Sequence, residues 1–96
     1  MADMLYISFL NRLYKHCKKT PKGRIDIRKL VTDKLPYDRC FTYMLWAEQD
    51  NICTISVMFD YTYIYLTQEV FMMSSTDYEE LLIKKFNIKH DRRKTT

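Results

Sequence analysis

Residues 24–67 combine two short helical segments with a β-hairpin, and this order of elements restricts the fold more than any other feature of the chain. Apolar residues at helical spacing predict a helix over 27–34 and another over 39–49. Pro36 separates the two helices, because the residue before a proline disfavours helical dihedral angles. Asp38 is suited to cap the second helix, since its carboxylate accepts hydrogen bonds from free backbone amides.

The hairpin is predicted from two segments in which side-chain character alternates along the chain. Residues 52–59 and 61–66 are rich in β-branched and aromatic residues and alternate with a period of two, as strands do. The short link at Asp60 joins them into a hairpin. Residues 24–26 form a short extended segment, with Asp26 as the cap of the helix that follows. Helices beside an antiparallel hairpin indicate an α+β fold.

Amphipathic helices are predicted on both sides of this unit. Over residues 3–19, apolar positions recur every three or four residues, and a following Pro-Lys-Gly segment ends the helix. A last helix is predicted over 77–88, where Thr76 and Glu79 fit a capping box. Residues 68–73 are compatible with either a helical turn or an extension of the preceding strand.

In the order and spacing of these elements, the chain resembles the winged helix-turn-helix superfamily over about residues 4 to 88. The resemblance implies a winged-helix fold in one domain, residues 1–90, with 91–96 as a basic tail. It further implies a small dimeric transcription regulator, of the archaeal or viral kind, that binds double-stranded DNA through its third helix.

The resemblance also assigns roles to particular side chains. At about 100° per residue, the third helix turns Cys40, Phe41, Met44, Leu45 and Ala47 inward and another set outward. The outward set is expected to read bases: Arg39, Thr42, Tyr43, Trp46 and Gln49. Phosphate contacts are expected from cations around the first loop and second helix: Lys18, Lys19, Lys22, Arg24 and Arg28. The wing is expected at Asp60, Tyr61 and Thr62.

Charge is distributed unevenly along the chain, although the net charge is only +4. Residues 1–34 contain nine basic and three acidic side chains, and residues 84–96 contain six basic and one acidic. Between them, residues 35–83 contain eight acidic side chains and a single Arg. The third helix and the wing lie in this acidic part, and phosphate binding requires cations. The affinity for DNA is therefore expected to come from residues outside them.

Three features leave alternatives open. Trp46 either contacts a partner or packs against the hairpin or the last helix. Tyr61, Tyr63 and Tyr65 share one strand face, which is typical of core packing or a dimer interface but also of a platform for single strands. The alternative to DNA binding is a winged helix used for protein contact, as in a polymerase-associated or viral accessory factor, with Tyr43, Trp46 and the tyrosines as the interface.

The last helix is apolar around much of its circumference. Tyr78, Leu82 and Phe86 form one strip, and either the first helix or another subunit must cover the remaining apolar side. A homodimer with this strip as its interface is the expected arrangement, and its two-fold symmetry would match palindromic DNA sites.

Several classes of function have no support in the sequence. The three cysteines form no CxxC pair and the two histidines are far apart, so neither a disulfide framework nor a metal site is expected. No nucleophile or phosphate-loop motif is present, and we expect neither an enzyme nor a bound cofactor. No apolar run is long enough to cross a membrane, and no export signal is apparent. An intracellular, cytoplasmic location is expected, in the nucleoid or in the host cell of a virus.

Overall fold

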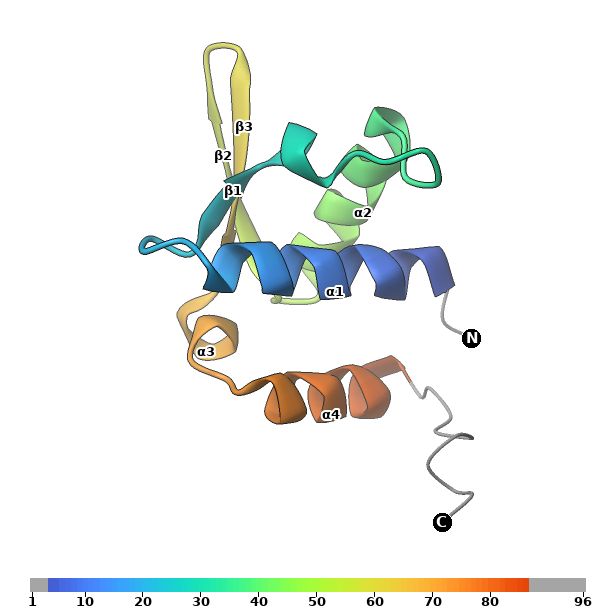
Figure 1. Ribbon diagram of the computed structural model, residues 1–96, viewed down its shortest axis with the longest axis vertical. Coiled ribbons are helices and arrows are strands. Elements are labelled where there is room, and N and C mark those ends of the chain that lie inside the picture. Colours follow the sequence, from blue (N-terminus) through green and yellow to red (C-terminus); the bar gives the residue numbers. More distant parts are fainter. Residues whose placement is uncertain (1–3, 87–96) are drawn as a thin grey trace.

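Helix α1 (Met4–Lys18) runs through the middle of the molecule, with the sheet and α2 on one side and α4 on the other (Figure 1). This computed structural model describes residues 4–86. The helix predicted over 3–19 is confirmed within that range. Its buried side chains recur every three or four residues: Tyr6, Ile7, Phe9, Leu10, Leu13, Tyr14 and Cys17.

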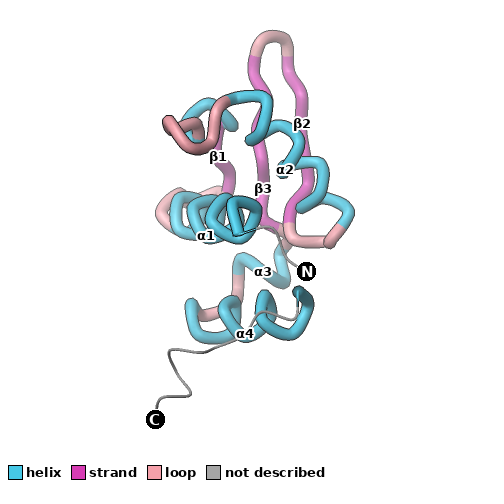
Figure 2. Tube along the Cα trace, turned by 90° about the vertical axis from the view of Figure 1, so that its right-hand side faces the viewer, coloured by secondary structure: helices cyan, strands magenta, loops and turns pink. Residues whose placement is uncertain are grey.

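The other elements follow α1 in an order that confirms the predicted α+β fold class. They are β1 (Arg24–Asp26), a 3₁₀ helix η1 (Ile27–Leu30), α2 (Tyr37–Gln49), β2 (Cys53–Met58), β3 (Tyr61–Leu66), α3 (Gln68–Phe71) and α4 (Ser75–Phe86). Figure 2 shows the three strands side by side, with the β2–β3 hairpin projecting beyond the helices. The predicted tail, residues 91–96, lies outside the described residues.

The sheet is antiparallel throughout, with the strand order β1-β3-β2. Alternate side chains therefore point to opposite faces. Ile64 and Cys53 are buried on the face that packs against the helices, and the Cys17 thiol of α1 lies 3.7 Å from the Ile64 carbonyl oxygen. Tyr63 and Tyr65 point to the other face, where both are half-buried.

The strand predicted over 61–66 is confirmed as β3, so Tyr61 and Thr62 of the expected wing are its first two residues and Asp60 lies in the turn before it. Register pairs Met58 with Tyr61, which leaves a two-residue turn of Phe59 and Asp60. Phe59 has a φ of 52°, a left-handed conformation that a bulky residue rarely adopts.

The second helix was predicted over 27–34, but only the single turn of η1 forms. Val31 at its end is extended, and Thr32 and Leu35 exchange backbone hydrogen bonds across a tight turn. This turn brings Leu35 into the core, where 2% of it is exposed. Pro36 disfavours a helical conformation at Leu35, which favours the turn over a longer helix.

Helix α2 begins two residues before the predicted start. Pro36 is its N-cap without a side-chain hydrogen bond, and Asp38 lies inside the first turn, so the predicted capping by Asp38 was wrong. A proline at this point costs the helix no backbone hydrogen bond, because the first amides of a helix have no intrahelical acceptor. The predicted end of the helix at residue 49 is confirmed, and Asn51 follows it in a left-handed conformation with a φ of 62°.

Helix α4 packs on α1, opposite the sheet. The rings of Tyr78 and Tyr14 stack at 4.1 Å, and the Tyr78 hydroxyl donates a 2.8 Å hydrogen bond to the Leu10 carbonyl oxygen. Tyr78 and Leu82 are 2% and 3% exposed within a single chain, so their predicted place in a dimer interface was wrong. Phe86 is half-buried and meets Tyr6 edge to face. The first helix thus covers the side that a second subunit was expected to cover.

The start of α4 also differs from the predicted capping box of Thr76 and Glu79. The Ser74 hydroxyl accepts a hydrogen bond from the Asp77 amide at 3.1 Å, which places the cap two residues earlier. The α3 turn before it resolves the ambiguity at 68–73 in favour of helix.

The three cysteines are free thiols buried in the core. Burial raises the pKa of the Cys17 and Cys53 thiols to about 12. Both thiols are therefore protonated at neutral pH and act as small apolar side chains.

Replacing Tyr78 by Phe tests the docking of α4. The change removes the donor to the Leu10 carbonyl oxygen while the stacked ring remains, so the free energy of unfolding should fall by about 1–2 kcal/mol in urea denaturation. Tyr37→Phe is the matched control, because Tyr37 is 43% exposed, and it should change stability by less than about 0.5 kcal/mol. Equal stability of the two variants would contradict the docking of α4 through Tyr78.

Candidate nucleic-acid interface

Three tyrosines line the outer face of the sheet. Tyr61, Tyr63 and Tyr65 alternate along β3, and their inward neighbours Ile64 and Leu66 are buried. The rings of Tyr61 and Tyr63 lie 6.1 Å apart with 20° between their planes. Tyr61 is 47% exposed, and the other two are half-buried. The stripe is therefore a partly solvated surface of the monomer and not part of its core.

Two arginines lie over these rings. The Arg24 guanidinium is 4.5 Å from the centroid of the Tyr63 ring, and that of Arg28 is 4.7 Å from the Tyr61 ring. Arg24 also donates a 3.2 Å hydrogen bond to the Tyr65 hydroxyl, which raises the pKa of Arg24. We call these five residues the tyrosine–arginine face.

Strand pairing explains why the sequence brings these residues together. β1 is antiparallel to β3, and Arg24 stands opposite Tyr65 on the same face. Arg28 reaches the face from η1, where its guanidinium binds the Asp26 carboxylate at 2.6 Å. This hydrogen-bonded pair lowers the pKa of Asp26. Asp26 also accepts a hydrogen bond from the Arg28 amide, so the start of η1 fixes the direction of the arginine.

A basic groove adjoins the tyrosine–arginine face. It has a volume of about 490 Å³ and lies between the C-terminal half of α1, β1 and η1. Its polar and aromatic lining comprises His16, Lys19, Thr20, Arg24, Asp26, Lys29 and Tyr63. Arg24 and Tyr63 belong to both surfaces, which makes the groove and the face continuous.

The pKa of His16 is lowered in this groove. Burial lowers the pKa of His16, and the positive charges of Arg12, Lys19 and Lys15 lower it further. Burial and, after it, these nearby cations disfavour protonation of His16, and a bound anion would favour protonation.

Sequence reasoning missed one residue of the groove, His16. The three- and four-residue spacing of Arg12, His16 and Lys19 along one side of α1 would have indicated His16. No pattern in the sequence places Lys29 beside it, because the two lie on different elements.

The side chains expected to read bases are only partly where they were predicted. Arg39, Thr42, Tyr43 and Trp46 line one groove of about 420 Å³ with Pro36 and Asp38. Gln49 is exposed at the end of α2, outside that groove. Tyr43 is 2% exposed, so its predicted outward position was wrong.

Trp46 packs in a way that neither alternative anticipated. It meets Tyr6 of α1 edge to face, with the ring centroids 5.2 Å apart, and it remains 41% exposed. Phe41 and Leu45 were predicted to point inward, but they are 38% and 42% exposed. The buried side of α2 is thus rotated from the predicted one, because α1 offers an aromatic surface to Tyr43.

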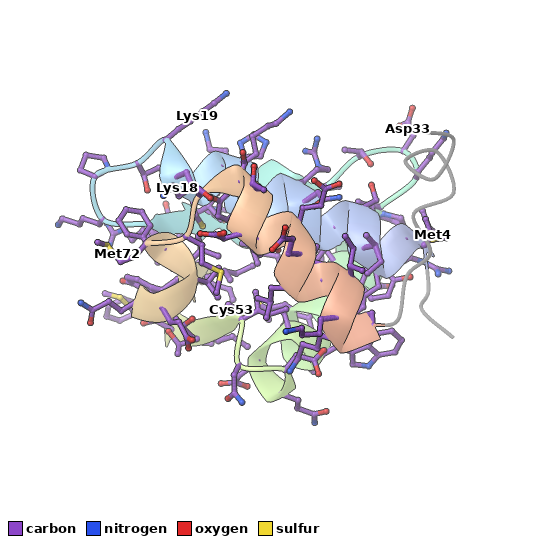
Figure 3. The ribbon with its side chains drawn as sticks, turned by 90° about the horizontal axis from the view of Figure 1, so that it is seen from below. Met4, Lys18, Lys19, Asp33, Cys53 and Met72 are labelled. Carbon is purple, nitrogen blue, oxygen red and sulfur yellow. The ribbon has the colours of Figure 1, made fainter. Side chains whose placement is uncertain are left out.

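Three of the expected phosphate contacts, Lys18, Lys19 and Lys22, lie at the end of α1 and on the loop after it. Lys18 donates hydrogen bonds of 2.6 and 3.2 Å to the carbonyl oxygens of Phe71 and Met73, so it holds the chain around α3 in place. Lys19 and Lys22 are exposed on the loop after α1. Figures 1 and 3 both place that loop and α2 on opposite sides of the molecule. The structure therefore separates these lysines from the expected base-reading set, whereas Arg28 lies on η1, which packs against α2.

No protein-family model matches the sequence, and neither a curated protein nor a solved structure shows a significant match to the chain. Within residues 4–86, no helix has the length and apolar character needed to cross a membrane. The same residues contain no cluster of three or more His, Cys, Asp or Glu side chains arranged to hold a metal ion.

The pKa of His16 tests the cation cluster directly. Lys19→Gln should raise it towards the ordinary histidine value, because one of the surrounding positive charges is removed, and an NMR titration of the assigned imidazole measures the change. Lys22→Gln removes an equal charge from the same loop and should leave the His16 pKa unchanged. A result in which both or neither of the variants shift the pKa would contradict the proximity of Lys19.

Proposed function

We propose that this protein is a winged-helix protein that binds single-stranded nucleic acid on its tyrosine–arginine face and basic groove. The element order α1, β1, η1, α2, β2, β3 and the strand order β1-β3-β2 support the winged-helix assignment. The stacking of Arg24 and Arg28 on β3 tyrosines carries the functional proposal.

The chemistry of this face suits unpaired bases. Bases stack on tyrosine rings and on arginine planes with little dependence on sequence, and a guanidinium also binds phosphate. The adjoining groove supplies Lys19 and Lys29 for the backbone of the same strand. Aromatic and cationic groups therefore lie on one continuous surface, which is the combination that single-strand binding requires.

Helix α2 is a poorer candidate for duplex binding than its place in the fold suggests. Its exposed side chains include Phe41, Leu45 and Trp46 together with Asp38 and Glu48. Its one basic residue, Arg39, donates a hydrogen bond to the Tyr43 hydroxyl. A surface with this charge gains little from phosphate neutralisation.

Tyr61→Ala tests the proposal in a fluorescence anisotropy titration with a labelled single-stranded oligonucleotide. Loss of one stacking ring should weaken binding by about 1–3 kcal/mol, or about 5- to 150-fold. Tyr37→Ala on α2 is the control, because Tyr37 is exposed to a similar extent, 43% against 47%. Weakening by Tyr37→Ala alone would move the interface to α2, and absence of binding at low ionic strength would refute the proposal.

A second candidate function is docking of a protein on α2. The observation that favours it is the exposed apolar strip of Tyr37, Phe41 and Leu45, which recur at four-residue spacing on one side of the helix. Acidic side chains beside the strip, at Asp38 and Glu48, would suit a partner of positive charge.

The single tryptophan separates the two candidates. Trp46 lies on α2 and is 41% exposed, so a molecule bound there should shift or quench its emission. An oligonucleotide on the outer face of the sheet should leave that emission unchanged while its anisotropy rises. Quenching of Trp46 in proportion to binding would instead favour α2.

A further inference from the structure

Strand β2 forms one edge of the sheet, since it pairs with β3 on one side only. The Thr67 amide donates to the Ile52 carbonyl oxygen, which identifies the even-numbered residues of β2 as those hydrogen-bonded to the hairpin partner. Ile55 and Val57 therefore direct their backbone amides and carbonyls outwards. Within residues 4–86, these outward groups have no hydrogen-bond partner.

This edge lacks the features that normally prevent strand addition. Residues 53–58 read Cys-Thr-Ile-Ser-Val-Met and contain no charge, no proline and no glycine. Sheet edges in soluble proteins are usually protected by lysines, prolines, bulges or covering segments. An uncharged strand of six residues with free backbone groups is a template for a further strand.

Apolar side chains are also exposed at the end of this edge. Val57 is 69% exposed, Met58 is 50% exposed and Phe59 is 100% exposed. Phe59 occupies a left-handed turn position that asparagine or glycine would adopt with less strain. An exposed phenylalanine in a strained conformation contributes nothing to the stability of the monomer, which indicates a partner for this end of the hairpin.

We propose that β2 pairs antiparallel with β2 of a second copy of this chain, about a two-fold axis at Ser56. The axis places Ile55 opposite the Val57 of the other copy, so the outward backbone groups of both copies hydrogen-bond one another. The two sheets then continue as one sheet of six strands.

The chemistry of the strand favours a second copy as the occupant. With the axis at Ser56, Ile55 lies opposite Val57, Ser56 lies opposite itself, and Thr54 lies opposite Met58. No charged residue of β2 opposes a like charge, because β2 contains none. The pairing also covers Val57, Met58 and Phe59, which are the most exposed apolar residues of the hairpin.

A two-fold axis perpendicular to the sheet keeps the outer faces of both copies on the same side. The two tyrosine–arginine faces then form one platform with Ser56 at its centre. Only the use of this joined platform for nucleic acid rests on the proposed function. The self-pairing is tested without nucleic acid, so the two proposals fail independently.

Sedimentation of the full chain at high micromolar concentration tests the pairing. The wild type should sediment as a dimer, and Val57→Lys as a monomer, because a lysine at this position brings two positive charges to the new interface. Val31→Lys, at an apolar residue 37% exposed at the end of η1, is the control and should remain a dimer. Far-UV circular dichroism shows that each variant is folded. A monomeric wild type, or a dimeric Val57→Lys, would overturn the proposal.

Disulfide trapping tests the position of the axis. Ser56 would face its own copy at a non-hydrogen-bonded site, where Cα atoms lie about 4.5 Å apart, within reach of a disulfide. Ser56→Cys should therefore give a covalent dimer on mild oxidation, since the three native thiols are buried. Thr54→Cys is the control, because its two copies would lie about 13 Å apart and no bridge can form. Equal trapping of both variants would overturn the register, and trapping of neither would overturn the interface.

Discussion

The burial of α1 on two sides is the interaction on which the rest of the structure depends. On one side its apolar residues pack against the sheet and α2, through contacts such as Cys17 with the Ile64 carbonyl and Tyr6 with Tyr43. On the other side Tyr14 and Leu10 receive Tyr78 of α4. Because α1 occupies the inner face of the sheet, the tyrosines of β3 can point only to the opposite face. The solvated aromatic surface is thus a consequence of how the helix is buried.

Alternation along β3 gives the two faces of the sheet different environments. Ile64 and Leu66 belong to the core, and the tyrosines between them are free for other roles. The arginines that stack on the tyrosines also tie the sheet together, since Arg24 bonds Tyr65 across two strands and Arg28 holds Asp26. The proposed binding surface is therefore ordered before any ligand arrives, which reduces the entropy lost on binding.

Patterns within one element predicted the helices and strands well. Features that depend on contacts between elements could not be predicted from the sequence. The spacing of apolar residues in α1 and the alternation in β2 and β3 are local and gave the correct elements. The rotation of α2 was not predictable, because Tyr43 is buried only where Tyr6 of α1 meets it. Similarly, the pattern around Tyr78 fitted either a core contact or a dimer contact. The packing of Tyr78 on α1 shows that it is a core contact. The tyrosines were noted in the sequence, but their pairing with Arg24 and Arg28 depends on the register of β1 against β3.

The way α4 is attached has a consequence for the dynamics of the domain. This helix contributes only Tyr78 and Leu82 as fully buried side chains, whereas α1 contributes seven. Segments with few buried apolar contacts open at lower free energy than the core does. Detachment of α4 would bring Tyr14 and the rest of the second apolar side of α1 into contact with water while the sheet stays intact. The strength of this one helix–helix contact therefore sets how often a partly open, association-prone form of the protein is populated.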